Sequence, residues 1–192
     1  IILPEDFHMP AAGVGIRWPE EPFIVMEERL SRYKHPAILA FARANTLDYC
    51  AWPSRVSGSL QQSNPSFGQR STNNGGARFG IVSSGKAYLD TMQALADLGI
   101  SADVAQALGL AVYKVSMPYP LEAQGIREFC KGLQQVLVVE EKRPLIEGQL
   151  KEILYGTANA PRVLGKRDHQ EHALLPDFGE LSPAMLARVI VK

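Results

Sequence analysis

Residues 136–140, with the sequence VLVVE, decide the fold class of this chain. The run is β-branched or apolar up to its final glutamate, so it is apolar on both faces of an extended strand. A strand of that kind suits the middle of a parallel sheet. Gly132 before it and Pro144 after it mark the end of one helix and the start of the next.

The same alternation of strand and helix continues on both sides. Further short strands are expected at residues 78–83, 110–115 and 162–164, and helices at 87–98, 101–108, 121–131, 144–155 and 182–191. Ser101 and Ser182 are expected to cap two of these helices. Strands that alternate with helices favour a mainly parallel sheet covered on both faces. We therefore predict a three-layer α/β/α domain with a sheet of four to five strands.

An extended arm and helices are predicted before this domain. Residues 1–20 are rich in proline and glycine and are expected to form the arm. From Glu20 to about Asp48, apolar residues recur at helical spacing as Phe23, Met26, Leu30, Tyr33, Ala37, Phe41, Ala44 and Leu47. Pro36 interrupts the stretch, which predicts two helices or one kinked near His35. We expect the apolar stripe to pack against the domain core, and a coiled-coil dimer seam is the alternative.

The composition changes between residues 51 and 77. Ser, Gln, Asn and Gly are frequent there and apolar residues are few, which is typical of a flexible linker or insertion. The predicted organisation is therefore an N-terminal arm and helices over 1–50, a low-complexity segment over 51–77, and the α/β domain over 78–192.

Charge and cysteine usage exclude several classes of protein. The 20 basic and 20 acidic residues give a formal net charge of +0, and no basic run suggests a nucleic-acid partner. No apolar run is long enough for a membrane span. Cys50 and Cys130 lie far apart and form no CxxC pair, so no zinc or iron–sulfur site is expected from neighbouring cysteines. Two cysteines in a chain of this size are normal for a reducing compartment, and a cytoplasmic location is expected. The opening residues 1–4 (IILP) suggest a cut inside a longer polypeptide.

The first strand-to-helix turn is a candidate anion site. Residues 80–86 match the GxxxxGK spacing of a phosphate-binding loop, but Ala87 stands where a Ser or Thr would bind Mg²⁺. A weaker version keeps Ser83, Ser84, Gly85 and Lys86 as an anion site at a helix N-terminus. The alternative is a tight turn with no ligand, and we favour it.

Two more groups are expected at the carboxyl edge of the sheet, where open α/β sheets bind ligands. Glu140, Glu141, Lys142, Arg143 and Glu147 form a charged cluster that favours salt bridges or partner contacts over catalysis.

Met117 and Tyr119 lie in a proline-stiffened loop, a pattern that suits an interface or packing over the sheet edge. His169 and His172 are too isolated for a metal site, and no catalytic motif of a hydrolase is present. We therefore assign no catalytic or metal-binding residue.

Several blocks of the sequence resemble the indolepyruvate ferredoxin oxidoreductase family of 2-oxoacid oxidoreductases. They are residues 3–7, 16–19, 32–34, 40–45, 79–90, 94–100, 114–122, 138–151, 165–168 and 179–184. The resemblance covers nearly the whole chain except about 25 residues between Trp52 and Ala77.

The resemblance implies a parent enzyme that oxidatively decarboxylates arylpyruvates to aryl-acetyl-CoA. Thiamine diphosphate with Mg²⁺ would carry the decarboxylation, coenzyme A would be the co-substrate, and electrons would leave through iron–sulfur clusters to ferredoxin or another acceptor. This chain would correspond to the transketolase C-terminal-like domain, a mostly architectural part. The motifs for thiamine diphosphate and the cluster cysteines are absent from this sequence.

We therefore expect a non-catalytic domain, inactive in isolation, that contacts other domains of its polypeptide and a second subunit in a homo-oligomeric parent. Two alternatives stay open: a stand-alone phosphate or nucleotide binder that uses the Gly85-Lys86 turn, and a protein-interaction domain.

Overall fold

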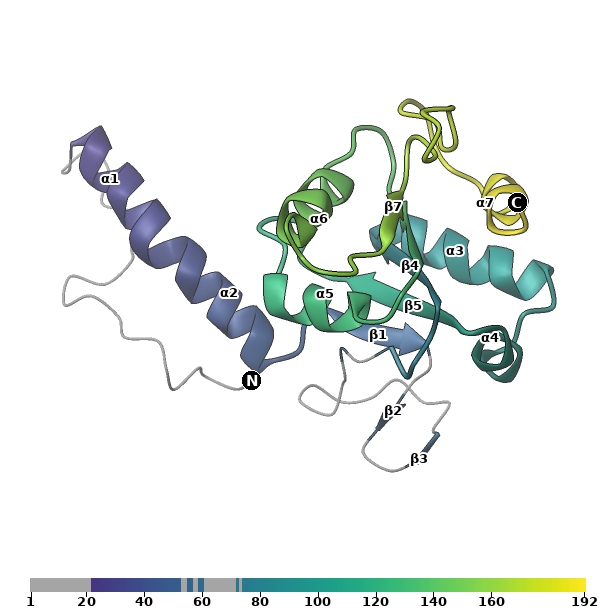
Figure 1. Cartoon of the computed structure of the whole chain (residues 1–192). Coiled ribbons are helices and arrows are strands. Elements are labelled where there is room, and N and C mark those ends of the chain that lie inside the picture. The colour runs from purple at the N-terminus through teal and green to yellow at the C-terminus, as the bar shows by residue number, and fades with distance from the viewer. Residues whose placement is uncertain (1–21, 53–54, 57–58, 61–71, 73) are drawn as a thin grey trace.

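The computed structural model describes residues 22–52, 55–56, 59–60, 72 and 74–192, so the expected arm lies outside the described residues (Figure 1). The elements are α1 (Phe23–Arg29), the π-helical turn η1 (Leu30–Lys34), α2 (His35–Ala44), β1 (Tyr49–Trp52), β2 (Arg55–Val56), β3 (Ser59–Leu60), β4 (Phe79–Ser84), α3 (Gly85–Asp97), α4 (Ala102–Leu108), β5 (Leu110–Val115), α5 (Ala123–Cys130), β6 (Gln135–Val139), α6 (Ile146–Leu154), β7 (Arg162–Leu164) and α7 (Pro183–Ile190).

The main sheet has five strands in the order β1-β5-β4-β6-β7. The strands β5, β4, β6 and β7 pair in parallel, and β1 pairs antiparallel with β5 at one edge. The four expected strands are all present, and residues 136–139 lie in the interior strand β6, which ends just before Glu140. The strand β1 was not predicted, and β2 and β3 pair separately as a short hairpin.

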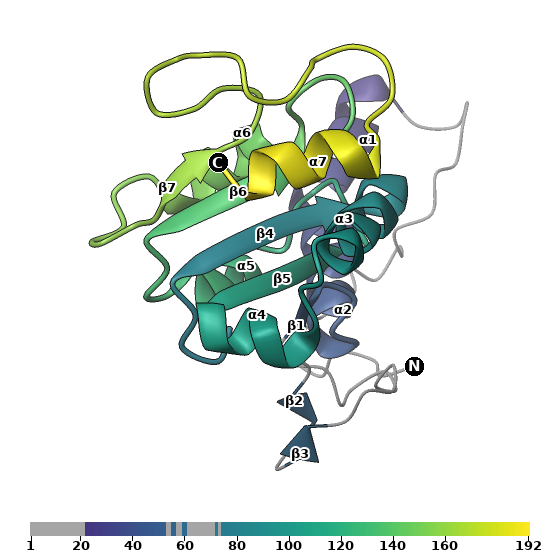
Figure 2. The same cartoon turned by 90° about the vertical axis from the view of Figure 1, so that its right-hand side faces the viewer.

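Helices cover both faces of this sheet, which confirms the three-layer prediction (Figures 1 and 2). One core lies between the sheet and α5 with α6, and its largest buried side chains include Tyr113 and Phe129. The other core lies under α3 and α7 around Leu95 and Leu186. The hydroxyls of Ser101 and Ser182 accept from backbone N–H groups of α4 and α7, as expected of helix caps.

The strand order reverses at β4. The connection through α3 and α4 leads to β5 on one side of β4, and the connection through α5 leads to β6 on the other side. In doubly wound sheets, the carboxyl ends of the two strands at such a reversal border a crevice that commonly binds ligands. Here those strands are β4 and β6.

The expected N-terminal helix is one rod with a π-helical turn in it. The N–H of His35 donates to the carbonyl of Leu30, five residues earlier, and α2 continues directly from η1. Pro36 lies in the first turn of α2 and has no N–H to donate. The wider π-helical turn therefore lets the rod pass the proline without breaking.

The first half of this rod stands away from the α/β body (Figure 1). The helix α1 has no buried residue, whereas α2 buries Ala42 against the body. The prediction that the whole apolar stripe packs on the domain core is therefore wrong for α1. The rod lies against the body only at its α2 end, and the stripe residues of α1 are beyond that contact. None of the described helices is long and apolar enough to cross a bilayer.

The described end of the low-complexity segment is attached to α5. Asn74 is buried, and its amide nitrogen donates to the carbonyl oxygens of Phe129 and Lys131. The same side chain accepts from the N–H of Gly76. The chain is thus held against the body just before β4 begins.

Candidate functional site

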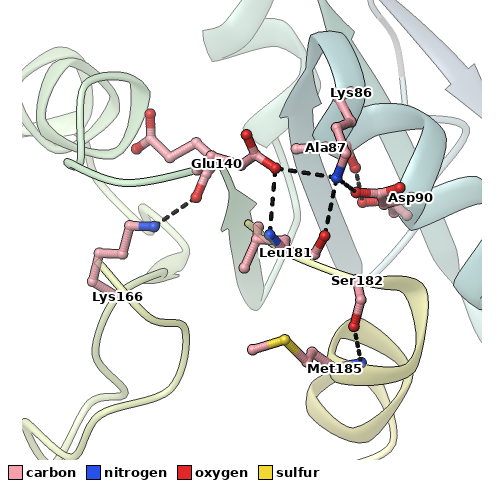
Figure 3. Close-up of polar contacts among 10 residues, drawn as sticks. Lys86, Ala87, Asp90, Glu140, Lys166, Leu181, Ser182 and Met185 are labelled. Carbon is pink, nitrogen blue, oxygen red and sulfur yellow. Dashed lines mark hydrogen bonds and ion pairs between the residues drawn. The ribbon is translucent and has the colours of Figure 1, made fainter. Parts of the chain in front are cut away.

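The strand order brings the two predicted charged regions together. Ser83 pairs with Val139 in the parallel ladder between β4 and β6, so the turn that carries Lys86 lies beside Glu140 and Glu141. Figure 3 shows Lys86 facing the segment that enters α7 at Leu181, and the backbone carbonyl of Glu140 facing Lys166. These residues stand at the crevice between β4 and β6.

The ammonium group of Lys86, on an exposed side chain, makes three contacts inside the chain. Its Nζ lies 2.7 Å from Asp90 Oδ2, 3.2 Å from Glu141 Oε1 and 3.0 Å from the carbonyl oxygen of Leu181 (Figure 3). The hydrogen bond to Asp90, followed by that to Glu141, raises the pKa of Lys86. Glu141 also accepts from the N–H of Leu181 at 3.3 Å, so β6, α3 and the start of α7 are joined at one point.

This geometry disfavours a bound anion. One ammonium with two carboxylates leaves a net negative charge, which repels phosphate or sulfate. Gly85 adopts a φ of +53°, as a tight strand-to-helix turn requires, and the Ser84 side chain makes no capping bond. Ser83 is fully buried, and its hydroxyl has no hydrogen-bond partner within the described part of the chain.

Glu140 is a helix cap. Its carboxylate accepts from the N–H groups of Leu145 at 3.0 Å, Ile146 at 2.8 Å and Glu147 at 2.9 Å. These are the first N–H groups of α6, which have no partner inside the helix and carry its positive partial charge. The Glu140 carboxylate therefore stabilises the start of α6, and the backbone carbonyl of Glu140 accepts from Lys166 Nζ at 2.5 Å.

The Glu147 carboxylate likewise bonds groups of this chain. Its two carboxylate oxygens accept from Lys151 Nζ at 2.7 Å and from the N–H of Lys166 at 3.0 Å. A β-carbon on Gly165 would lie 2.2 Å from Glu147 Oε2, so the glycine is what lets β7 and α6 approach so closely. Burial lowers the pKa of Lys166, whose ammonium also bonds the carbonyl oxygen of Pro176.

The other predicted residues lie further out. Lys142 and Arg143 are exposed, and Met117 is half-buried. Tyr119 is exposed but meets the His35 ring edge-on, with 6.0 Å between ring centroids. The loop that carries Met117 and Tyr119 therefore contacts the N-terminal rod.

The two loop histidines form no metal site. His172 Nδ1 lies 3.5 Å from Asp168 Oδ2, while His169 is exposed. Across the described ranges, no group of three or more His, Cys, Asp or Glu side chains is arranged to hold a metal ion.

A second polar group, missed by sequence reasoning, lies at the base of the rod. Asp48, Arg43 and Glu122 line a cavity of about 430 Å³ between α2, the segment that leads from it to β1, and the start of α5. Arg43 donates to Glu122 Oε1 through Nε at 3.1 Å and Nη2 at 3.0 Å, and Glu122 caps α5 as Glu140 caps α6. No spacing pattern links Glu122 to Arg43, which is 79 positions earlier, or to Asp48.

Asp48 fastens the end of the rod to β5. Its Oδ1 accepts from the N–H of Ser116 at 2.7 Å and from that of Met117 at 3.1 Å. Its other oxygen and the hydroxyl of buried Tyr113 have no partner among the described residues. Burial, opposed by these two hydrogen bonds, raises the pKa of Asp48 from 3.8 to about 6.

The larger cavity, about 700 Å³, lies at the opposite edge of the sheet, among α4, α7 and the amino ends of β4 and β6. It is lined mostly by aliphatic side chains such as Ile81, Leu137 and Ile190. Neither cavity includes any of the residues predicted at the carboxyl edge. We retain the carboxyl edge as the candidate site because the charged side chains converge there. Their hydrogen-bonding groups are already paired with groups of the same chain.

Comparison with known families agrees with this architecture. The model of the indolepyruvate oxidoreductase domain matches residues 69–192. The chain belongs to this family. The matched segment begins within the low-complexity segment and contains the parallel strands, whereas the N-terminal rod and β1 precede it.

The similar curated proteins are subunits IorA of indolepyruvate oxidoreductases. The protein of Methanothermobacter thermautotrophicus is 33% identical over 119 residues, which are 61% of this chain and 17% of that protein. Those of Pyrococcus abyssi and Thermococcus kodakarensis are 35% and 33% identical over 116 residues, 60% of this chain and 16% of each protein. This chain thus spans about a sixth of the length of the relatives it matches.

Among solved structures, a split-gene transketolase described as an inactive β4 tetramer is similar over 59% of this chain and 37% of its own. The TM-score is 0.41 and the sequence identity 17%. At that level the likeness adds nothing to the topology seen directly in the sheet.

Proposed function

We propose that this chain is a non-catalytic structural and interface domain of an indolepyruvate (arylpyruvate) ferredoxin oxidoreductase. The parent enzyme would oxidatively decarboxylate 2-oxoacids to acyl-CoA with thiamine diphosphate. Membership of the indolepyruvate oxidoreductase domain family supports the parent's reaction class. The non-catalytic role rests on this chain's own residues.

The observation that carries the proposal is the crevice between β4 and β6. Lys86 and Glu141 pair across it, and Glu140 and Glu147 are bonded to backbone N–H groups. A general acid or base must reach the substrate proton and keep a pKa suited to the transfer. Carboxylates that cap a helix and bridge two elements serve stability first.

The cofactors of the parent would bind elsewhere. A thiamine diphosphate site needs oxygen ligands for Mg²⁺, and the described residues offer no cluster suited to a metal ion. Iron–sulfur clusters need grouped thiolates, whereas Cys50 and Cys130 are both buried within a hydrophobic core. The residues present therefore do not fit these groups, and we assign thiamine diphosphate, Mg²⁺, iron–sulfur clusters, coenzyme A and ferredoxin to the parent. Its further subunits and homo-oligomeric assembly belong to the same proposal, as does a cytoplasmic location.

The alternative of a stand-alone phosphate or nucleotide binder finds no support in the crevice. A phosphate-binding loop would need the Lys86 ammonium to reach the phosphate, and here that ammonium is paired with Asp90 and Glu141.

Calorimetric titration of the 192-residue chain tests the proposal. We expect Mg-ATP, Mg-thiamine diphosphate and coenzyme A each to bind no more tightly than millimolar. Tight binding of Mg-ATP that Lys86→Ala abolishes would establish the nucleotide-binding alternative. Tight binding of thiamine diphosphate or coenzyme A would place this domain in the active site.

A further inference from the structure

The N-terminal rod exposes an apolar surface that the α/β body does not cover. Phe23 is 67% exposed, Ile24 69%, Leu30 45% and Ile38 43%. The other side chains of α1 include Glu27, Glu28 and Arg29, so apolar and charged side chains share a helix without any buried position. A helix of this kind is stabilised in proteins by packing of its apolar side chains.

The base of the rod is bonded to the α/β body, whereas α1 at its other end has no buried residue. Arg43 is bonded to Glu122, and Asp48 is bonded to the backbone N–H groups that follow β5. Ser116 Oγ also donates to the carbonyl oxygen of Leu47 at 2.7 Å, and His35 contacts Tyr119. The direction of the rod is therefore set from its base, which holds α1 at a defined distance from the sheet.

We infer that Phe23, Ile24, Leu30 and Ile38 form the docking surface for another domain of the same oxidoreductase polypeptide. This inference rests on the proposed function. The rod precedes the family-matched residues 69–192, and this chain spans about a sixth of the length of its curated relatives. A helix at that position adjoins the part of the polypeptide that lies outside the matched domain.

The small size of the surface favours a tethered partner over a free one. A few apolar side chains on a single helix form a patch much smaller than a stable interface between separate molecules. Separate molecules also lose translational and rotational freedom when they associate. A domain joined by a short linker meets the rod at an effective concentration of roughly millimolar, so the same contacts suffice. Charged residues around the patch, such as Glu28 paired with Arg32, form its polar rim.

Amide hydrogen exchange tests the surface in two samples, the 192-residue chain and the longer oxidoreductase polypeptide that contains it. Exchange of residues 23–38 is expected to be at least tenfold slower in the longer polypeptide. There Leu30→Asp should restore the rate of the isolated chain. The matched control, Ser31→Asp, adds the same charge at an exposed polar neighbour and should leave the protection intact.

Equal exchange rates in the two samples would overturn the inference, as would equal effects of Leu30→Asp and Ser31→Asp. A dimer of the isolated chain by sedimentation, converted to a monomer by Leu30→Asp, would also overturn it, because the occupant would then be a second copy. The proposed function is measured separately on the longer polypeptide as thiamine-dependent oxidation of arylpyruvate. Protection of the rod without that activity would contradict the proposed function and support the docking surface.

Discussion

The carboxyl edge of the sheet and the N-terminal rod differ in how far their side chains find partners within the chain. At the edge, charged side chains gather where a ligand is expected, yet Lys86, Glu140 and Glu147 all find partners within the chain. On the rod, apolar side chains such as Phe23 and Leu30 remain exposed. The first region forms its contacts within the domain, and the second leaves apolar side chains without cover from the α/β body. The charged side chains therefore make contacts within the domain, and the exposed apolar side chains of the rod are the ones we propose as an interface.

The largest expected effect breaks the internal side of this comparison. Glu140→Ala removes an acceptor shared by three backbone N–H groups, because its carboxylate caps α6. We expect the free energy of unfolding to fall by about 2–4 kcal/mol in urea denaturation. Glu152→Ala, an exposed position on the same helix, is the control and should change it by less than about 0.5 kcal/mol. Similar losses in both variants would show that Glu140 is not a cap.

A second prediction concerns Asp48, where the rod joins the body. A pKa raised from 3.8 to about 6 means that the folded state binds the proton more tightly than the unfolded state. Its contribution to stability is therefore complete below about pH 4 and lost as the pH rises through about 6, by about 3 kcal/mol in total.

Asp48→Asn keeps an acceptor for Ser116 and Met117 but cannot ionise. The difference in unfolding free energy between this variant and the unmodified chain should change by about 2–3 kcal/mol between pH 4 and 7, in favour of the variant at the higher pH. A difference that does not vary with pH would mean that Asp48 is ionised normally in the fold.

A third prediction uses two glycines of the charged edge. Gly165→Ala places a methyl group against the carboxylate of Glu147 and should destabilise the domain by about 1–3 kcal/mol. Gly148→Ala lies in α6 with no atom near the new methyl group, and should stabilise it by about 0.5–1 kcal/mol. Thermal unfolding of both variants decides the matter, and a stabilising Gly165→Ala would refute the close approach of β7 to α6.

The smallest expected effect lies on the rod. Phe23→Ser removes a large apolar side chain, yet the unfolding free energy of the 192-residue chain should change by less than about 0.5 kcal/mol, because the residue is mostly exposed. Loss of more than about 1.5 kcal/mol in a urea titration would show that the tip of the rod packs on the body.

The sequence predicted the parts of the fold whose signals are local. Short β-branched runs gave β4, β5, β6 and β7, and capping residues such as Ser101 and Ser182 placed helix starts. The strand β1 was not predicted because its four residues are too few to show an alternation of apolar and polar side chains. Its place at the sheet edge is set by pairing with β5.

The partners of the charged residues could not be predicted from the sequence either, because the paired residues are far apart in the chain. Lys86 and Glu141 are 55 positions apart, and only the reversal of strand order at β4 brings them together. Arg43 and Glu122 are 79 positions apart. The anion-site and interface interpretations of the carboxyl edge both stay predictions, because the contacts observed there are ion pairs and helix caps within the chain.

Turnover of the proposed parent oxidoreductase with Glu141→Gln tests the central claim most directly. Glu141 is the partly exposed carboxylate at the crevice, so its substitution leaves the helix cap of Glu140 in place. If the edge is structural, kcat for arylpyruvate oxidation should stay within about threefold of the unmodified enzyme. A loss of about 100-fold or more, the size typical of a missing general acid or base, would contradict the account.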